Sequence, residues 1–155
     1  MKSDSLMVQK ESITPRLLGY LGLLPFIVSS LLVWVPEYHH YAVQSLTIYA
    51  AVIVTFIGGV HWGLAMQASK TSSNHDDQYI RKQFIFSVIP SLVAWLAVVV
   101  AQQYSLIIIA ICFVSFWYLE KTIFSKALEN WYTTLRNHLT LVATLFIVIG
   151  WLGTQ

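Results

Sequence analysis

The chain has 155 residues, of which 57% are apolar and only 10% are charged, and its formal net charge is +2. A soluble domain carries about 25% charged residues, so this chain has too few polar groups to cover a surface in water. The composition therefore excludes an ordinary soluble protein and indicates a protein of the lipid bilayer. The small net charge gives no support for a nucleic-acid partner, and the single cysteine, Cys112, excludes an internal disulfide.

Long apolar stretches follow one another along the chain, and a helix needs about 20 residues to cross a hydrocarbon core of about 30 Å. We expect one transmembrane domain over residues 17–155, preceded by a polar tail over residues 1–16. Its spans are predicted at residues 17–35, 43–66, 84–101, 104–119 and 139–152. None of these stretches alternates between apolar and polar side chains, as the strands of a membrane barrel do. The predicted fold class is therefore all-α, an integral membrane bundle of five transmembrane helices.

The positive side chains predict how the chain is oriented in the membrane. Three precede the first predicted span, three lie between the second and third, and three lie between the fourth and fifth: Lys2, Lys10, Arg16, Lys70, Arg81, Lys82, Lys121, Lys126 and Arg136. Lysine and arginine favour the cytoplasmic side of a membrane. We therefore expect a multi-pass protein of the bacterial inner membrane, with its N-terminus in the cytoplasm and its C-terminus outside.

The segment between the fourth and fifth predicted spans has apolar side chains at helical spacing and contains neither glycine nor proline. These side chains are Ile123, Phe124, Ala127, Leu128, Trp131, Tyr132 and Leu135. The pattern is typical of an amphipathic helix that lies in the membrane interface, with its basic face toward anionic headgroups. We therefore predict such an interfacial helix between helices 4 and 5. The alternative is a cytoplasmic extension of the fifth span.

Small residues and prolines indicate where helices pack closely or bend. Gly59 and Gly63 form a GxxxG pair in the second span, and Gly58 lies on a neighbouring stripe of small residues. Such stripes let another helix backbone approach closely, which predicts a central position for the second span. Pro25 and Pro90 remove backbone donors, so we expect kinks in the first and third spans.

His61 is an ionisable side chain at membrane depth, which makes it a candidate for a functional site. A pocket in the cytoplasmic leaflet would bring together His61, Trp62, Trp131, Tyr132 and Arg136, and the arginine fork suits a phosphate or a carboxylate. The structural alternative is a neutral imidazole that hydrogen-bonds a residue of the third or fourth span and fixes packing. For Arg136, the alternative is anchoring by its charge alone.

The remaining chemistry-bearing residues show no catalytic or metal-binding pattern. No nucleophile accompanies His61, and no histidine, cysteine and carboxylate spacing is typical of a metal site. A haem held by His61 and His138 would have only that ligand pair in its support. We therefore predict no metal ligand and no catalytic residue, and the sequence implies no cofactor.

Two motifs resemble the signature of a family catalogued as domain of unknown function 3429, the transmembrane protein 69-like small polytopic membrane proteins. The first runs from Gly58 through Gly59, Val60, His61 and Trp62 to Gly63, and the second comprises Trp131, Tyr132, Leu135, Arg136, Leu139 and Thr140. Weaker elements are Leu18-Gly19, Gly22 to Phe26, and Pro90 ahead of Trp95. The family often has an aspartate after helix 4, where this chain has Glu120. The resemblance implies a small inner-membrane protein and no particular activity.

Three functional hypotheses follow from these observations. The first is a non-enzymatic accessory or assembly factor of a membrane complex, with a membrane-protein partner or a second copy of this chain. The second is a binding protein for a lipidic small molecule, such as a quinone, a lipid or a tetrapyrrole, in the cytoplasmic-leaflet pocket. The third is an enzyme that acts on a lipid, for which the sequence offers one histidine without a nucleophile.

Overall fold

The computed structural model describes residues 13–71, 77–100, 104–124 and 130–155, and apart from short turns these residues are helical. Its elements are α2 (Leu24–Leu32), α3 (His39–Thr71), α4 (Asp77–Val100), α5 (Ser105–Ile123) and α6 (Asn130–Leu152). Together with the helical residues that precede α2, they provide five helices long and apolar enough to cross a membrane: Ile13–Leu32, His39–Lys70, Asp77–Val99, Ser105–Ile123 and Asn130–Leu152. The predicted multi-pass, all-α membrane bundle is confirmed.

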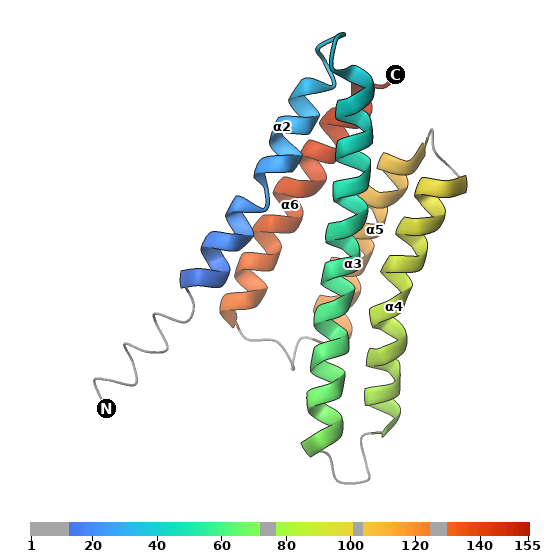
Figure 1. The fold of residues 1–155 in the computed structure, drawn as a ribbon. Coiled ribbons are helices and arrows are strands. Elements are labelled where there is room, and N and C mark those ends of the chain that lie inside the picture. Colours follow the sequence, from blue (N-terminus) through green and yellow to red (C-terminus); the bar gives the residue numbers. More distant parts are fainter. Residues whose placement is uncertain (1–12, 72–76, 101–103, 125–129) are drawn as a thin grey trace.

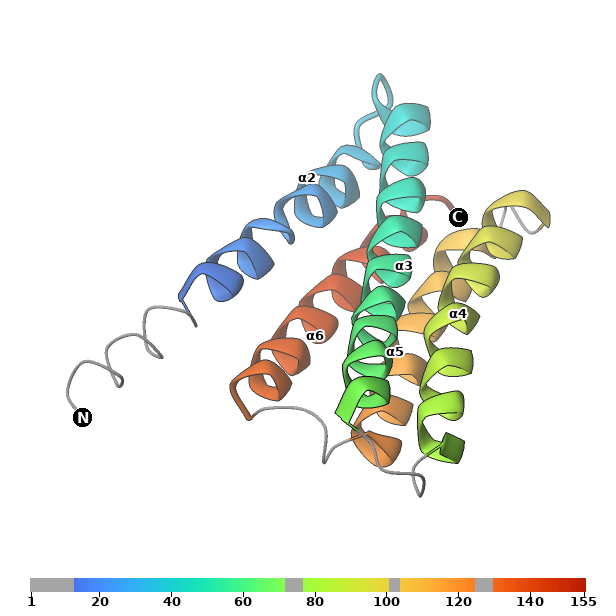
Figure 2. The same cartoon turned by 60° about the horizontal axis from the view of Figure 1, so that its bottom comes forward.

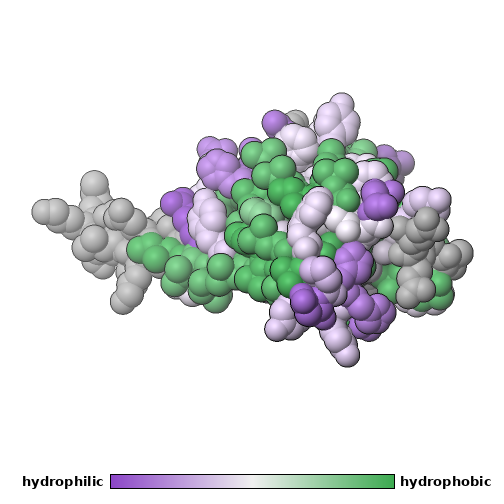
Figure 3. Space-filling view, turned by 90° about the horizontal axis from the view of Figure 1, so that it is seen from above, coloured by the Kyte–Doolittle hydropathy of each residue, from purple (hydrophilic) through white to green (hydrophobic). Residues whose placement is uncertain are grey.

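The helices run up and down, and α3 is the central one (Figures 1 and 2). It packs against α2, α4, α5 and α6, whereas α2 lies against α6 on one side and α4 against α5 on the other. The expected central position of the second span is therefore confirmed. Seen along the helices, apolar side chains reach the surface beside hydrophilic ones (Figure 3). An apolar outer surface is what a helix bundle presents to lipid.

The first span is interrupted just before Pro25. Residues 22 and 23 form a turn between the helical residues 13–21 and α2, and Pro25 lies in the first turn of α2. A proline at this position lacks the backbone donor that a continuous helix would use. The Tyr49 hydroxyl of α3 donates a hydrogen bond of 2.8 Å to the carbonyl oxygen of Gly22. A side chain of the neighbouring helix thus supplies a partner to the backbone at the interruption, as lipid requires.

The close approach of two helix backbones occurs at Gly58. A Cβ added there would clash with the backbone carbonyl of Ser87 on α4 and would lie 3.6 Å from Pro90, which is inside that helix. A Cβ added to Gly59 or Gly63 would meet no heavy atom within 4 Å. Of the three α3 glycines that the sequence singled out, Gly58 is therefore the closely packed one, and the GxxxG face is open.

The predicted interfacial helix is absent from the described residues on either side of the α5–α6 connection. α5 continues to Ile123 and α6 begins at Asn130, while residues 125–129 lie outside the described residues. Trp131, Tyr132 and Arg136 therefore belong to the fifth spanning helix, which starts nine residues earlier than expected. The reason is that Leu135 and Arg136 are buried in the bundle, so the apolar face that suggested an interfacial helix packs against other helices.

Candidate functional site

A buried carboxylate, Glu120, joins three helices near one end of the bundle. It lies in the last turn of α5 and is 2% exposed. Its Oε1 accepts a hydrogen bond of 3.1 Å from Nε2 of His61 on α3, and its Oε2 accepts one of 3.1 Å from Nε of Arg136 on α6. The structure thus brings His61 and Arg136 together through a side chain that the sequence singled out only by its position after the fourth span.

Two further side chains of α6 complete this network. The Arg136 guanidinium also donates to the hydroxyl of Thr140, one helical turn along, and the Tyr132 hydroxyl donates to Oε1 of Glu120 at 3.4 Å. The remaining terminal nitrogen of Arg136, Nη2, is buried and has no hydrogen-bond acceptor among the described residues. One strong donor of a charged group therefore lacks a partner among the described residues.

His61 lies in an aromatic enclosure and is 0% exposed. Its ring centroid is 5.0 Å from that of Phe86, 5.8 Å from that of Phe116 and 5.2 Å from that of Phe124. A carboxylate only accepts hydrogen bonds, so the imidazole carries a proton on Nε2. His61 therefore matches the structural alternative given by the sequence, a histidine bonded to the fourth span, and it contributes to the site through Glu120.

The charges of this network balance each other inside the membrane. An unpaired charge in a membrane helix is costly, by about 2.5–3.5 kcal/mol at the centre on insertion scales and less toward its ends. Glu120 and Arg136 are opposite charges with only 3.1 Å between bonded atoms. With a neutral imidazole at His61, the group has no net charge. The buried guanidinium is thus already compensated, and Nη2 suits an uncharged oxygen as its acceptor.

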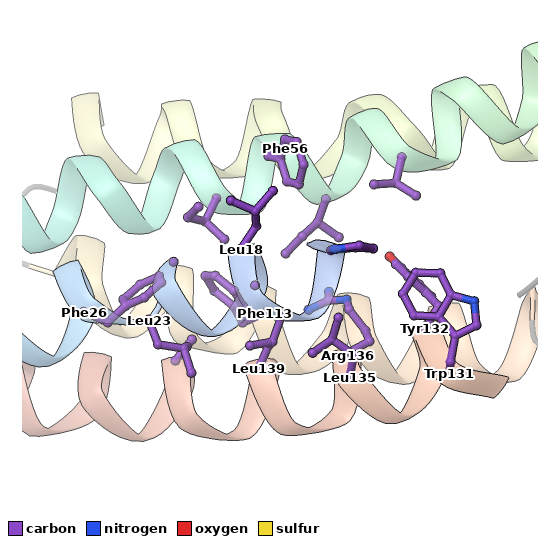
Figure 4. A pocket seen from close by; sticks show the side chains of 17 residues that line it. Leu18, Leu23, Phe26, Phe56, Phe113, Trp131, Tyr132, Leu135, Arg136 and Leu139 are labelled. Carbon is purple, nitrogen blue, oxygen red and sulfur yellow. The ribbon is translucent and has the colours of Figure 1, made fainter. Parts of the chain in front are cut away.

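Beside the network lies a cavity of about 420 Å³ between the first span, α3 and α6. Trp131 and Tyr132 lie at one end, Leu23 and Phe26 lie toward the other, and Arg136 lies between them beside Leu135 (Figure 4). Its other lining side chains are apolar: Pro15, Leu18, Ile53, Phe56, Ile57, Val60, Phe113, Leu135, Leu139 and Ala143, with Gly19 and Gly22. Pockets of about 300–1,000 Å³ with mostly apolar walls and few polar groups are typical of small-molecule sites.

The structure gathers only part of the predicted site at this cavity. Trp131, Tyr132 and Arg136 line it, whereas His61 and Trp62 do not. Trp62 is 47% exposed and packs edge-on against Phe84, with 4.9 Å between ring centroids. It faces outward on α3, consistent with an aromatic side chain near a membrane interface.

In the described part of the chain, the histidines do not lie together as a metal or haem site. That part holds no group of three or more histidine, cysteine, aspartate and glutamate side chains placed to bind a metal ion. His138 is exposed and lies within 3.3 Å of the Tyr20 hydroxyl, while His61 is enclosed and bonded to Glu120. The two histidines that could have formed a haem ligand pair therefore have different surroundings.

Comparison with known proteins identifies the family. The model of the family described as "Protein of unknown function (DUF3429)" matches residues 12–152, and the chain belongs to this family. It is 29% identical over 145 residues to transmembrane protein 69 of Xenopus tropicalis, a match that covers 90% of this chain and 54% of the relative. The chain thus spans about half the length of that curated relative. No solved structure matches.

Proposed function

We propose that this protein binds a lipidic small molecule of the membrane in the cavity between the first span, α3 and α6. The observation that carries the proposal is a cavity of about 420 Å³ with nearly continuous apolar walls, lined also by Arg136, which has one buried nitrogen without a hydrogen-bond partner among the described residues. Apolar volume between helices that no side chain fills forfeits packing unless a hydrocarbon occupies it, and a buried guanidinium nitrogen without an acceptor costs free energy. A ligand with an apolar body and an oxygen acceptor would relieve both.

The walls favour a lipid chain over the other ligands that the sequence suggested. The cavity extends along the helices from Trp131 to Phe26 (Figure 4), which suits an extended hydrocarbon. A quinone offers two carbonyl oxygens on opposite sides of its ring, but the side chains that line the cavity toward Phe26 are apolar and offer the second oxygen no donor. A tetrapyrrole carries carboxylates and central nitrogens, and apolar side chains offer those groups no partners. We therefore place an uncharged ester or carbonyl oxygen beside Nη2 of Arg136 and the chain along the cavity.

Native mass spectrometry of the protein extracted from its own membrane in mild detergent tests this proposal. Val60 lines the cavity on α3, and Val52 is an exposed valine of the same helix outside it. We expect a stoichiometric lipidic molecule on the wild-type protein, lost in Val60→Phe, where the larger ring fills the cavity, and kept in Val52→Phe. Retention by both variants, or no small molecule on the wild-type protein, would contradict the proposal.

A second candidate function is the accessory or assembly factor of a membrane complex. The observation that favours it is the open face of α3 at Gly59 and Gly63, where an added Cβ would meet no heavy atom within 4 Å. Such faces allow close association of membrane helices. Gly59→Leu should then abolish co-purification of a defined partner or a second copy, while Val52→Leu should not. Unchanged partner recovery in Gly59→Leu would count against this function.

We also propose that the end of the bundle that holds the network faces the cytoplasm of a bacterial inner membrane. Arg16 lies at the start of the first span, Lys70 at the end of α3, Arg81 and Lys82 in the first turns of α4, and Lys121 at the end of α5. Because the helices alternate in direction, these charges share one end. Alkaline phosphatase fused to the C-terminus should be active in a bacterial host. An inactive phosphatase fusion, together with a fluorescent fusion of green fluorescent protein at the same terminus, would show the opposite orientation.

A further inference from the structure

We propose that a cleft beside the cavity is the headgroup site for the same ligand, and that this headgroup is a phosphate. This inference rests on the proposed function and specifies the ligand class, a phosphate-bearing lipid with one chain in the cavity. The cleft has a volume of about 500 Å³ and lies between the first span and the start of α6. Its polar lining comprises Arg16, Tyr20, Asn130, Thr134 and His138.

The cleft and the cavity are neighbours that share part of their walls. Trp131 and Leu135 line both. A molecule with its head in the cleft would pass these two side chains of α6 before its chain reached the apolar walls. Arg136, which lines only the cavity, would then meet the molecule between head and chain, where an ester-linked lipid carries its carbonyl oxygen.

The two arginines differ in whether their charge is already compensated. Arg136 is paired with Glu120 at 3.1 Å. Arg16 forms no ion pair with an acidic side chain of the described ranges, and none of the residues that line the cleft is acidic. An anion is therefore favoured at Arg16, and an uncharged acceptor is favoured at Arg136. The phosphate of the ligand therefore belongs beside Arg16, and its uncharged carbonyl oxygen belongs beside Arg136.

The other side chains of the cleft supply donors for phosphate oxygens. The Tyr20 hydroxyl lies 3.3 Å from Nδ1 of His138, and when this hydroxyl donates to Nδ1, the other ring nitrogen carries the proton and can donate to a ligand. Asn130 and Thr134 of α6 add an amide and a hydroxyl to the same side of the cleft, and both groups can donate to phosphate oxygens. Arg16 of the first span and His138 of α6 line opposite sides of the cleft, so a phosphate bound in it would meet both.

Binding of two matched probes to the purified protein in neutral detergent tests the inference. The probes are oleoyl lysophosphatidic acid and monoolein, which share the acyl chain and differ in the phosphate. We expect the phosphate probe to bind the wild-type protein at least about tenfold more tightly, because a charge-assisted hydrogen bond of about 1.5–3 kcal/mol corresponds to that factor or more. Arg16→Gln should remove this advantage and leave monoolein binding unchanged, and Arg81→Gln on α4, away from the cleft, is the matched control.

The possible outcomes separate the two proposals. If neither probe binds the wild-type protein, the proposed lipid-binding function fails. If both probes bind equally and Arg16→Gln changes neither, the phosphate site is overturned while lipid binding stands. If inorganic phosphate alone binds with the same Arg16 dependence and monoolein does not bind, the cleft takes free phosphate and the lipid assignment is overturned. His138→Gln is a second test of the site. It should weaken binding of the phosphate probe by less than Arg16→Gln does and leave monoolein binding unchanged.

Discussion

Neutralising Glu120 should destabilise the bundle more than any other single polar substitution in the network. Glu120 accepts hydrogen bonds from His61, Arg136 and Tyr132. In Glu120→Gln the guanidinium of Arg136, which is 7% exposed, keeps its charge and its bond to the hydroxyl of Thr140, but it loses the negative charge that compensates it. Breaking a buried ion pair from one side costs about 3–5 kcal/mol. We expect a loss of this size in the free energy of unfolding.

The matched double variant distinguishes a charge effect from a packing effect. Glu120→Gln/Arg136→Gln removes both charges and keeps two amides that can bond each other, so it should be more stable than the sum of the single losses predicts. Coupled residues show interaction energies of about 0.5–3 kcal/mol, and we expect the upper part of this range. Equilibrium unfolding in mixed micelles, followed by circular dichroism, gives the free energy of unfolding of the wild-type protein, the two single variants Glu120→Gln and Arg136→Gln, and the double variant. Additive losses would refute the reasoning, because they would mean that the two charges do not stabilise each other.

Three further substitutions test the packing and the site. Gly58→Ala should lower the free energy of unfolding by about 1–3 kcal/mol, the usual cost of overpacking, because the added methyl group meets the α4 backbone. Gly59→Ala, where the added methyl group meets no atom, should change it little. Equal effects of the two substitutions on the unfolding midpoint would contradict the close contact of Gly58 with α4. Tyr49→Phe should cost about 1 kcal/mol, because the carbonyl of Gly22 loses its donor, and an unchanged unfolding free energy would show that this bond is replaced. Arg136→Lys should weaken retention of the ligand while the protein stays folded, because a lysine cannot bond Glu120, Thr140 and a ligand in the same fork geometry; undiminished retention in native mass spectrometry would exclude Arg136 from the site.

The membrane fold could be predicted because lipid constrains a sequence strongly. Every backbone polar group must be paired within the bilayer, so long apolar runs have to be helices. The error concerned the start of the last helix. Helical spacing, as at Trp131, Leu135 and Arg136, is the same for a helix that lies in the interface and for one that spans the membrane. The bond between Arg136 and Glu120 decides between these two cases. A single sequence does not show which helices are neighbours.

The site was predictable only in part for the same reason. His61 and Arg136 stood out as ionisable residues near a membrane, and the structure connects them. Glu120 lies at the end of an apolar span, so its sequence position resembles that of an interfacial charge, and only the arrangement of α3, α5 and α6 shows that it is buried. The three phenylalanines around His61 gave no signal, because phenylalanine is common on every face of a membrane helix.

Mapping where a photoreactive lipid chain attaches tests the central claim most directly. A lysophosphatidic acid with a diazirine at the end of its acyl chain would be crosslinked to the purified protein, and the labelled peptides would be identified by mass spectrometry. We predict attachment deep in the cavity, at Leu23, Phe26 or Phe113, and its loss in Val60→Phe. Attachment only to lipid-facing side chains such as Val52, unchanged in Val60→Phe, would contradict a ligand in this cavity.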